Sequence, residues 1–359
     1  MQPHFCCCVC PLSVVGIYIH YLLSYQTPNT NFKNTLKISR IHTPPPLDPM
    51  AETCIIIRKS IFTFLQKYQY FTSIPTLLAF PYAVSYLLTQ ALVSSSDSFP
   101  LIDARLRALF LAAMFPLSSS QPLTVLNRKL SQTSLSFLFV SPFTFSFLLL
   151  ARASVIIKSI DGHRKVTFSS LTTLFIPLVI TQFCNTLLIL AANATCFFLF
   201  AIFFNFFNIL GLPSSHGPLP FLTAIGAVIY SIILANSYVI CNLASISSGM
   251  ENRGGFVSIL KACVMIRGRM ATALSLAVTM NMALAAIEAL FHCRVVRRFH
   301  RDLAPDSVEF MEGIFIACLY AVFLVIDTIV GCTFWKSCKK VNQMDQYFHQ
   351  IEIQVRSDG

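Results

Sequence analysis

Two acidic side chains lie inside apolar segments, where an ionised group is costly. Asp327 falls near the middle of the apolar segment 311–335, and Glu288 falls nearer the end of the segment 271–292. A charge at the centre of a bilayer costs about 3 kcal/mol on insertion scales, so such a residue marks an ion or proton pathway unless a neighbouring helix satisfies it. Because no second acid stands at the depth of Asp327, we favour an interhelical hydrogen bond and keep a cation or proton relay as the alternative.

Amide side chains are further polar groups in the apolar segments. They can line a pathway, but they more often pin helices together, at about 0.6 kcal/mol each. Asn236 and Asn281 are the amides that we keep as candidates beside the two acids. The whole set comprises Gln182, Asn185, Asn193, Asn205, Asn208, Asn236, Asn242 and Asn281.

The patterns of common catalytic and metal sites are missing from the sequence. It has no Gly-x-Ser-x-Gly nucleophile, no His-Glu-x-x-His zinc motif, no phosphate-binding loop and no dinucleotide fingerprint. The 13 cysteines do not form two Cys-x-x-Cys pairs at zinc spacing, and several lie in apolar segments, where a thiol behaves as a small hydrophobic group. We therefore expect no enzyme, no metal and no cofactor.

The composition is that of a membrane protein. Hydrophobic residues make up 55% of the chain and charged residues 11%, whereas globular domains carry about 25% charged residues. The mean hydropathy is +0.68. The net charge of +11 is divided among clusters between apolar segments rather than gathered into one basic stripe, which argues against nucleic-acid binding. These features predict an all-α polytopic membrane helix bundle with interfacial amphipathic helices.

The number of spans depends on one long apolar segment. Residues 171–212 cover 42 positions, whereas about 20 suffice to cross a bilayer, so the segment is a hairpin of two spans or one overlong helix. With six spans and a cytoplasmic N-terminus most of the 26 Lys and Arg fall on the cytoplasmic side, whereas seven spans divide them almost equally. We therefore predict six spans, with both termini cytoplasmic. The predicted spans are 72–94, 134–157, 171–212, 221–247, 271–292 and 311–335.

The segments outside the spans complete the domain organisation. Residues 1–49 differ in composition and precede a Met-Ala-Glu sequence that resembles a natural start, so we expect an N-terminal extension outside the functional protein. Residues 50–340 form the multi-span domain, and residues 341–359 form a polar tail. The helical spacing of apolar and basic residues predicts two interfacial helices, over 55–71 and 101–115.

Small residues recur at every fourth position in two of the spans. This spacing places them on one helix face, where they let two backbones approach closely. It predicts a tightly packed bundle, within one chain or between copies, and specifies no ligand. The two faces are Ala227, Ser231 and Ala235, and Ala271, Ser275, Thr279 and Ala283.

The connection between the fourth and fifth spans has a clear local pattern. Gly254-Gly255 allows a turn, after which apolar residues share one helix face and Lys261 lies on the other. This pattern predicts a short amphipathic helix on the cytoplasmic surface. Arg267 and Arg269 can bind lipid phosphate or serve as topogenic charges, and we favour the topogenic role. The predicted apolar face comprises Phe256, Ile259, Leu260, Cys263 and Val264.

This connection resembles a loop of a plant family of uncharacterised multi-pass transmembrane proteins. The family's loop has a Glu, a Gly four positions later, then Ala, Lys-Ser, Leu and Gly-Lys/Arg. Similar loops occur in bacterial membrane domains attached to glycerophosphodiester phosphodiesterases, which is a looser likeness. The matching residues are Glu251, Gly255, Lys261, Gly268 and Arg269, whereas Ser258, Ala262 and Met265 stand where the family has Ala, Ser and Leu.

Two other segments agree with this resemblance. Residues 158–170 are similar to the family's Tyr-x-x-Lys-x-Val-x-Phe hinge, and residues 334–337 are similar to its aromatic-Cys-Lys-Ser exit, with the aromatic and Cys positions altered. The resemblance covers about 57–340 of the chain. It implies a six-span helical protein without catalytic residues, and it implies no particular activity.

These observations lead to two function hypotheses. The first is a non-enzymatic membrane helper or scaffold, which acts on membrane lipids or membrane-protein partners through packed helices and cytoplasmic amphipathic segments. The second is a transporter or channel that uses Asp327 in the last span. The choice between the endomembrane system and the plasma membrane stays open, as does assembly into a homo-oligomer.

Overall fold

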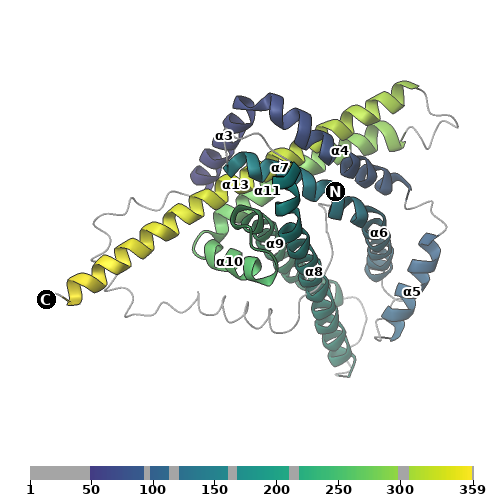
Figure 1. Cartoon of the computed structure of the whole chain (residues 1–359). Helices are drawn as coiled ribbons and strands as arrows, with labels where there is room; N and C mark the ends of the chain where they lie inside the picture. The colour runs from purple at the N-terminus through teal and green to yellow at the C-terminus, as the bar shows by residue number, and fades with distance from the viewer. Residues whose placement is uncertain are drawn as a thin grey trace.

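A computed structural model describes residues 49–92, 98–112, 121–160, 168–209, 218–297 and 307–357. Every regular element within these residues is helical, and the predicted extension over 1–49 lies outside them except for its last residue. The helices are α3 (Pro49–Gln66), α4 (Tyr68–Leu92), α5 (Ser98–Ala112), α6 (Gln121–Phe143), α7 (Leu149–Ile160), α8 (Phe168–Ile209), α9 (Pro218–Glu251), α10 (Phe256–Ile266), α11 (Met270–Phe291) and α13 (Ser307–Ser357), with π-helical turns η2 (Thr144–Leu148) and η3 (His292–Val296) (Figure 1).

The predicted all-α membrane bundle is confirmed. Helix α8 runs unbroken for 42 residues, so the long apolar segment is one helix and not a hairpin, as the six-span prediction requires. The chain is therefore a multi-pass membrane protein. Six segments of the described residues are long and apolar enough to cross a membrane: Tyr68–Thr89, Ser134–Ile160, Ser169–Phe200, Val228–Glu251, Met270–Val296 and Phe310–Gln343.

Prolines inside the spans free backbone carbonyls, and hydroxyl side chains bind these carbonyls. Pro75 in α4 has no N–H to donate to Phe71, and the Thr76 hydroxyl donates to that carbonyl instead, at 2.8 Å. Pro142 likewise leaves the carbonyl of Leu138 without its helical donor, and Ser141 Oγ lies 3.3 Å from it. The π-helical turn η2 follows directly, which is a common local adjustment of a helix in lipid.

Helices α8 and α9 pair through a seam of polar groups. The Asn185 amide donates to the Cys241 carbonyl and to Ser245 Oγ, both at 2.9 Å. Further along the pair the Tyr230 hydroxyl donates to Asn193 Oδ1 at 2.6 Å. The amides predicted to pin helices together therefore do so at these two positions.

Helix α13 packs against most of the other spans. Its side chains Val325 and Ile329 are buried against Phe71 of α4 and Val155 of α7. Two residues further along, Gly331 faces Ile246 of α9 so closely that an added Cβ would overlap the isoleucine side chain. A small residue at this position lets the two helices approach, which is the packing mode expected in lipid.

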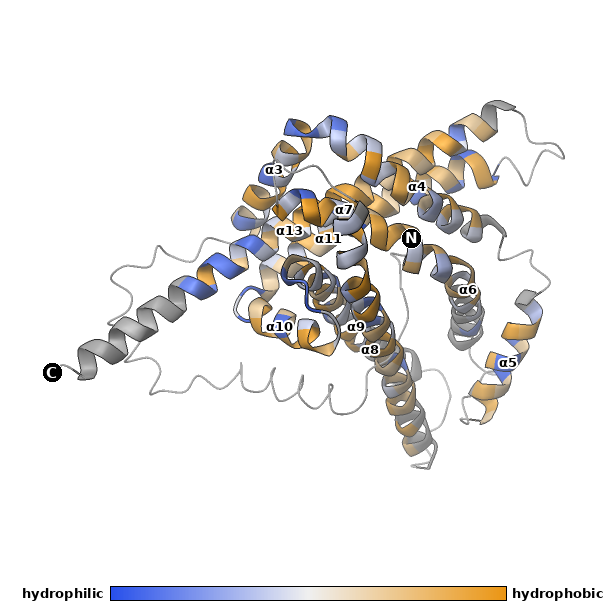
Figure 2. Cartoon of the chain, viewed as in Figure 1, coloured by the Kyte–Doolittle hydropathy of each residue, from blue (hydrophilic) through white to orange (hydrophobic). Residues whose placement is uncertain are grey.

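Two surface helices lie at the end of the bundle where α13 leaves it. Helices α3 and α10 both contact α13, one on each side of it (Figure 1). Where α13 leaves the bundle its coloured turns are largely hydrophilic, whereas the spans are mostly hydrophobic (Figure 2). Helix α13 continues as one helix to Ser357, into the segment predicted as a polar tail.

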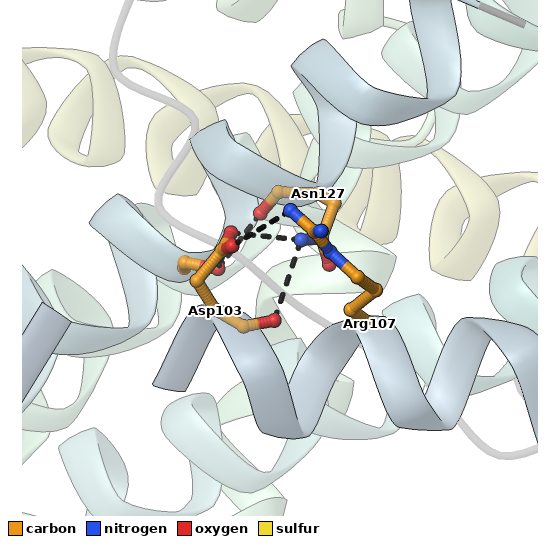
Figure 3. A network of polar contacts seen from close by, with 4 residues as sticks. Asp103, Arg107 and Asn127 are labelled. Carbon is orange, nitrogen blue, oxygen red and sulfur yellow. Dashed lines mark hydrogen bonds and ion pairs between the residues drawn. The ribbon is translucent and has the colours of Figure 1, made fainter. Parts of the chain in front are cut away.

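Helix α5 lies at the opposite end and covers most of the segment 101–115, for which an interfacial helix is predicted. It is held to α6 by Asp103, whose Oδ1 accepts from Asn127 Nδ2 at 2.8 Å and from the Ser131 hydroxyl at 3.3 Å. Arg107, one turn along, donates to the other carboxylate oxygen at 3.2 Å (Figure 3). Asp103 is thus a structural anchor that joins α5 to the second span.

The polar seam yields a stability prediction. Asn185→Leu keeps the side-chain size and removes both hydrogen bonds to α9, so we expect a loss of about 0.5–2 kcal/mol, measured as a lower midpoint of thermal unfolding in detergent. The matched control is Asn236→Leu, because Asn236 donates only to Ile232 of its own helix. An equal loss in both variants would show that the seam adds no stability.

Candidate functional site

The residues predicted from the α9–α11 connection meet at one end of the bundle. Glu251 ends α9, and Lys261 on α10 donates to both of its carboxylate oxygens at 2.7 Å. Lys339 of α13 approaches the same carboxylate, with Nζ 3.9 Å from Oε1. The Lys339 ammonium also lies 4.8 Å from the centre of the Trp335 ring, at cation–π distance. One glutamate therefore connects three helices.

Glycine is required at three positions of this connection, each time for a different structural reason. Gly255 directly precedes α10 and has φ +83°, and its N–H donates to Thr181 Oγ1 of α8 at 2.9 Å. Gly268 follows the end of α10 with φ +84°, in the left-handed region that favours glycine. Gly254 packs against the backbone of α8, and an added Cβ would lie 2.7 Å from the Pro177 carbonyl oxygen. The turn is thus seated on α8 by backbone contact.

Arg269 connects the same end to α3. Its guanidinium pairs with Glu52, and Nη1 donates to Ser337 Oγ of α13 at 3.1 Å. The Thr272 hydroxyl also donates to Glu52, at 3.0 Å. Sequence reasoning assigned Arg269 a topogenic role and did not single out Glu52, since the two residues are far apart in the chain. The structure places Arg269 in a half-buried contact of α3, α11 and α13.

Helix α10 differs from its predicted orientation in one respect. Ile259, expected on the same face as the other apolar residues, is buried against the bundle. Ser258 and Ala262 are buried on that inner side as well. The outward face is also apolar, so α10 is apolar on both sides, and its charged Lys261 turns to Glu251. The exposed apolar residues are Phe256, Val257, Leu260 and Val264.

Asp327 is buried in the last span, with 9% of its surface exposed. Its carboxyl forms a hydrogen bond with the side chain of Asn242 on α9 and interacts with the charge of Arg152 on α7. By the rise of an α-helix all three residues lie about 12–14 Å from the end that carries α10. The favoured interhelical hydrogen bond is therefore present, and the charge of Arg152 acts on the same carboxyl.

A small cavity adjoins this pair. It has a volume of about 40 Å³ and lies between α9, α11 and α13, with Asp327 and Asn242 as its polar lining. A space of this size with two hydrogen-bonding groups can hold a water molecule. Apolar side chains such as Met280 and Phe334 line the rest.

Polar groups continue from Asp327 towards the end of the bundle. Cys332, little more than one turn along α13, forms a hydrogen bond with Ser159 of α7. The Ser159 carbonyl in turn accepts from Lys336 Nζ at 2.5 Å. These contacts between α7 and α13 lie between the depth of Asp327 and the exposed Lys336.

The other predicted candidates are not part of this site. Glu288 is buried, and its carboxylate accepts from the Tyr320 hydroxyl at 3.2 Å. Asn281 is half-buried on α11. Asn236 is half-buried at a groove between α9 and α11. The structure thus brings together Asp327 and Asn242, and leaves the other three candidates apart.

Two members of the small-residue face of α9 lie beside a groove. Ser231 and Ala235 line this groove, whose volume is about 440 Å³. Leu274 and Val278 of α11 form its other wall, because bulky side chains and not the small residues of α11 face this gap. The closest approaches occur elsewhere, at Gly331 and at other glycines.

Comparisons with known proteins identify a family for this chain but indicate no activity. A family model described as a domain of unknown function, DUF8558, matches residues 51–349. No curated protein and no solved structure matches the chain. Among the residues that the structure describes, no three His, Cys, Asp or Glu side chains are grouped as metal ligands.

The charge of Arg152 near the buried Asp327 gives one prediction. Arg152→Met removes the nearby cation and Asp327→Leu removes the carboxyl that bonds Asn242, so each alone is expected to destabilise by about 1–3 kcal/mol, whereas the double variant should lose less than the sum. Thermal unfolding of the four proteins in detergent measures the coupling. The control cycle uses Arg294 and Glu312, a more exposed pair at 3.6 Å, where the effects should simply add. Additive losses at Arg152 and Asp327 would contradict the pairing.

The turn that precedes α10 gives a second prediction. Gly254→Ala places a methyl group against the Pro177 backbone, so we expect a loss of about 1–3 kcal/mol and increased proteolysis near α10. Gly313→Ala in α13 is the control, since its nearest neighbour would be at ordinary contact distance. Wild-type stability of Gly254→Ala would show that the turn is not held against α8.

Proposed function

The chain belongs to the DUF8558 family, a domain of unknown function, and we propose that it is a non-enzymatic membrane scaffold. Its six spans would hold α3 and α10 at one membrane surface, where they act on membrane lipids or membrane-protein partners. The observation that carries this proposal is the set of ion pairs, Glu251 with Lys261 and Glu52 with Arg269, which bind both surface helices to the bundle.

Helix α10 is held more rigidly than an amphipathic helix that is attached only through a flexible loop. Helix α10 is fixed by its buried inner face, by the turn on α8 and by Lys261, so its outward residues keep a fixed position relative to the spans. A preformed surface costs less conformational entropy when a partner binds than a mobile one does. A scaffold benefits from such rigidity.

We also propose that this end faces the cytoplasm. Basic residues predominate there, including Arg58 and Lys59 of α3 and Lys340 of α13. Cytoplasmic connections of membrane proteins carry an excess of Lys and Arg. With six spans the same orientation puts both termini in the cytoplasm.

The scaffold proposal predicts a partner that depends on the ion pairs. Purified from its native membrane in lipid discs, the wild-type chain should retain a stoichiometric membrane-protein partner. In Lys261→Gln/Arg269→Gln the surface helices lose their anchors, and recovery of the partner should fall about 10-fold or more. Arg294→Gln/Glu312→Gln, an ion pair at the other end, is the control and should behave as wild type. Absence of any stoichiometric protein, or equal recovery from all three, would contradict the proposal.

A second candidate function is a proton or cation carrier. The cavity beside Asp327 and Asn242 and the polar contacts towards Lys336 favour it, since both put ionisable or hydrogen-bonding groups within the bundle. In proteoliposomes with a trapped pH indicator, Asp327→Asn should abolish proton flux while Asn236→Leu, away from the cavity, retains it. Equal flux in both variants would remove Asp327 from any such role.

A further inference from the structure

We propose that the end of the bundle formed by α3, α10 and the adjoining part of α13 binds the headgroups of anionic phospholipids. This inference rests on the scaffold proposal and names the lipid class that its surface helices take. It depends on the net charge of this end, on the side chains that point outward, and on their position relative to the membrane surface.

The described side chains at this end are mostly basic. Several extend into the surroundings, among them Arg58 and Lys59 on α3 and Arg253 before α10. Each cation near an anionic membrane surface contributes about 1 kcal/mol of attraction. The basic residues there are Arg58, Lys59, Lys67, Lys158, Arg253, Lys261, Arg267, Arg269, Lys336, Lys339 and Lys340.

The acidic side chains described at the same end do not offset this charge at the surface. Glu52 is paired with Arg269, and Glu251 is paired with Lys261. Both carboxylates are largely covered, with about a fifth of each side chain exposed. The outward field at this end is therefore positive.

The cations stand beside exposed apolar side chains. On α3, Phe62 and Leu65 are 66% and 61% exposed and follow Arg58 at helical spacing. On α10, Phe256 is 54% exposed and lies three residues after Arg253. Much of α10 has hydrophobic colour (Figure 2), and its exposed residues include Val257, Leu260 and Val264. Large apolar groups interleaved with cations are typical of helices that lie in the headgroup region.

The position of these helices at the ends of the spans favours lipid, rather than an acidic soluble protein, as the ligand. Helix α10 connects the ends of two spans, α9 and α11, so its outward face lies where the hydrocarbon region meets the headgroups. There the apolar side chains enter the acyl boundary while the arginines reach phosphate. An acidic protein in water would satisfy the charges but leave Phe256 and Val264 uncovered.

Native mass spectrometry of the full chain in detergent tests this, with phosphatidylserine and phosphatidylcholine added separately. The wild type should bind phosphatidylserine preferentially. Arg58→Gln/Arg253→Gln should weaken phosphatidylserine binding about 5-fold per arginine removed and leave phosphatidylcholine binding unchanged. The matched control is Arg105→Gln/Arg297→Gln, which removes two exposed arginines at the opposite end and should bind as wild type does.

Two results would overturn the inference. One is equal binding of the two lipids by the wild type. The other is a loss of phosphatidylserine binding of the same size in the control double variant, which would mean that net charge and not this surface is responsible. If either occurs while a protein partner still co-purifies through the ion-paired helices, only the lipid inference fails and the scaffold proposal stands.

Discussion

The ion pairs at one end of the bundle are the contacts on which the remaining arrangement depends. Glu251 receives Lys261 and lies near Lys339, and Arg269 pairs with Glu52, so that α3, α9, α10, α11 and α13 are connected by a few side chains. Isolated surface ion pairs contribute little to stability. These are half-buried and shared between helices, and they fix where two surface helices sit relative to six spans. The apolar outward residues of α10 are useful to a partner or a lipid only because their position is fixed.

A second constraint acts inside the spans, where every polar group must find a partner in the protein. The Thr76 hydroxyl takes the carbonyl that Pro75 frees, and Asn185 reaches two groups of α9. Asp327 follows the same rule through Asn242 and Arg152. These contacts also explain why helices with little amphipathic character associate in lipid. Close approaches at glycine and hydrogen bonds across helices take the place of the hydrophobic effect.

Much of the architecture was predictable because length and hydropathy determine it. The six spans, the surface helices and the single long helix α8 follow from apolar segments and the distribution of Lys and Arg. Contacts between distant residues were not predictable. Nothing near Glu52 in the sequence indicates Arg269, and nothing near Asp327 indicates Arg152. The spacing of apolar residues also gave the wrong face for Ile259. Because α10 is apolar on both sides, the sequence does not indicate which side packs against the bundle.

Hydrogen exchange of the full chain in lipid discs tests the central claim most directly, that ion pairs hold α3 and α10 rigidly against the spans. The backbone amides of Pro49–Gln66 and Phe256–Ile266 should exchange about as slowly as those of the adjoining spans. In Arg269→Gln the protection of α3 should fall while that of α13 is retained. Rapid exchange of both surface helices in the wild type, or unchanged protection of α3 in Arg269→Gln, would contradict the account.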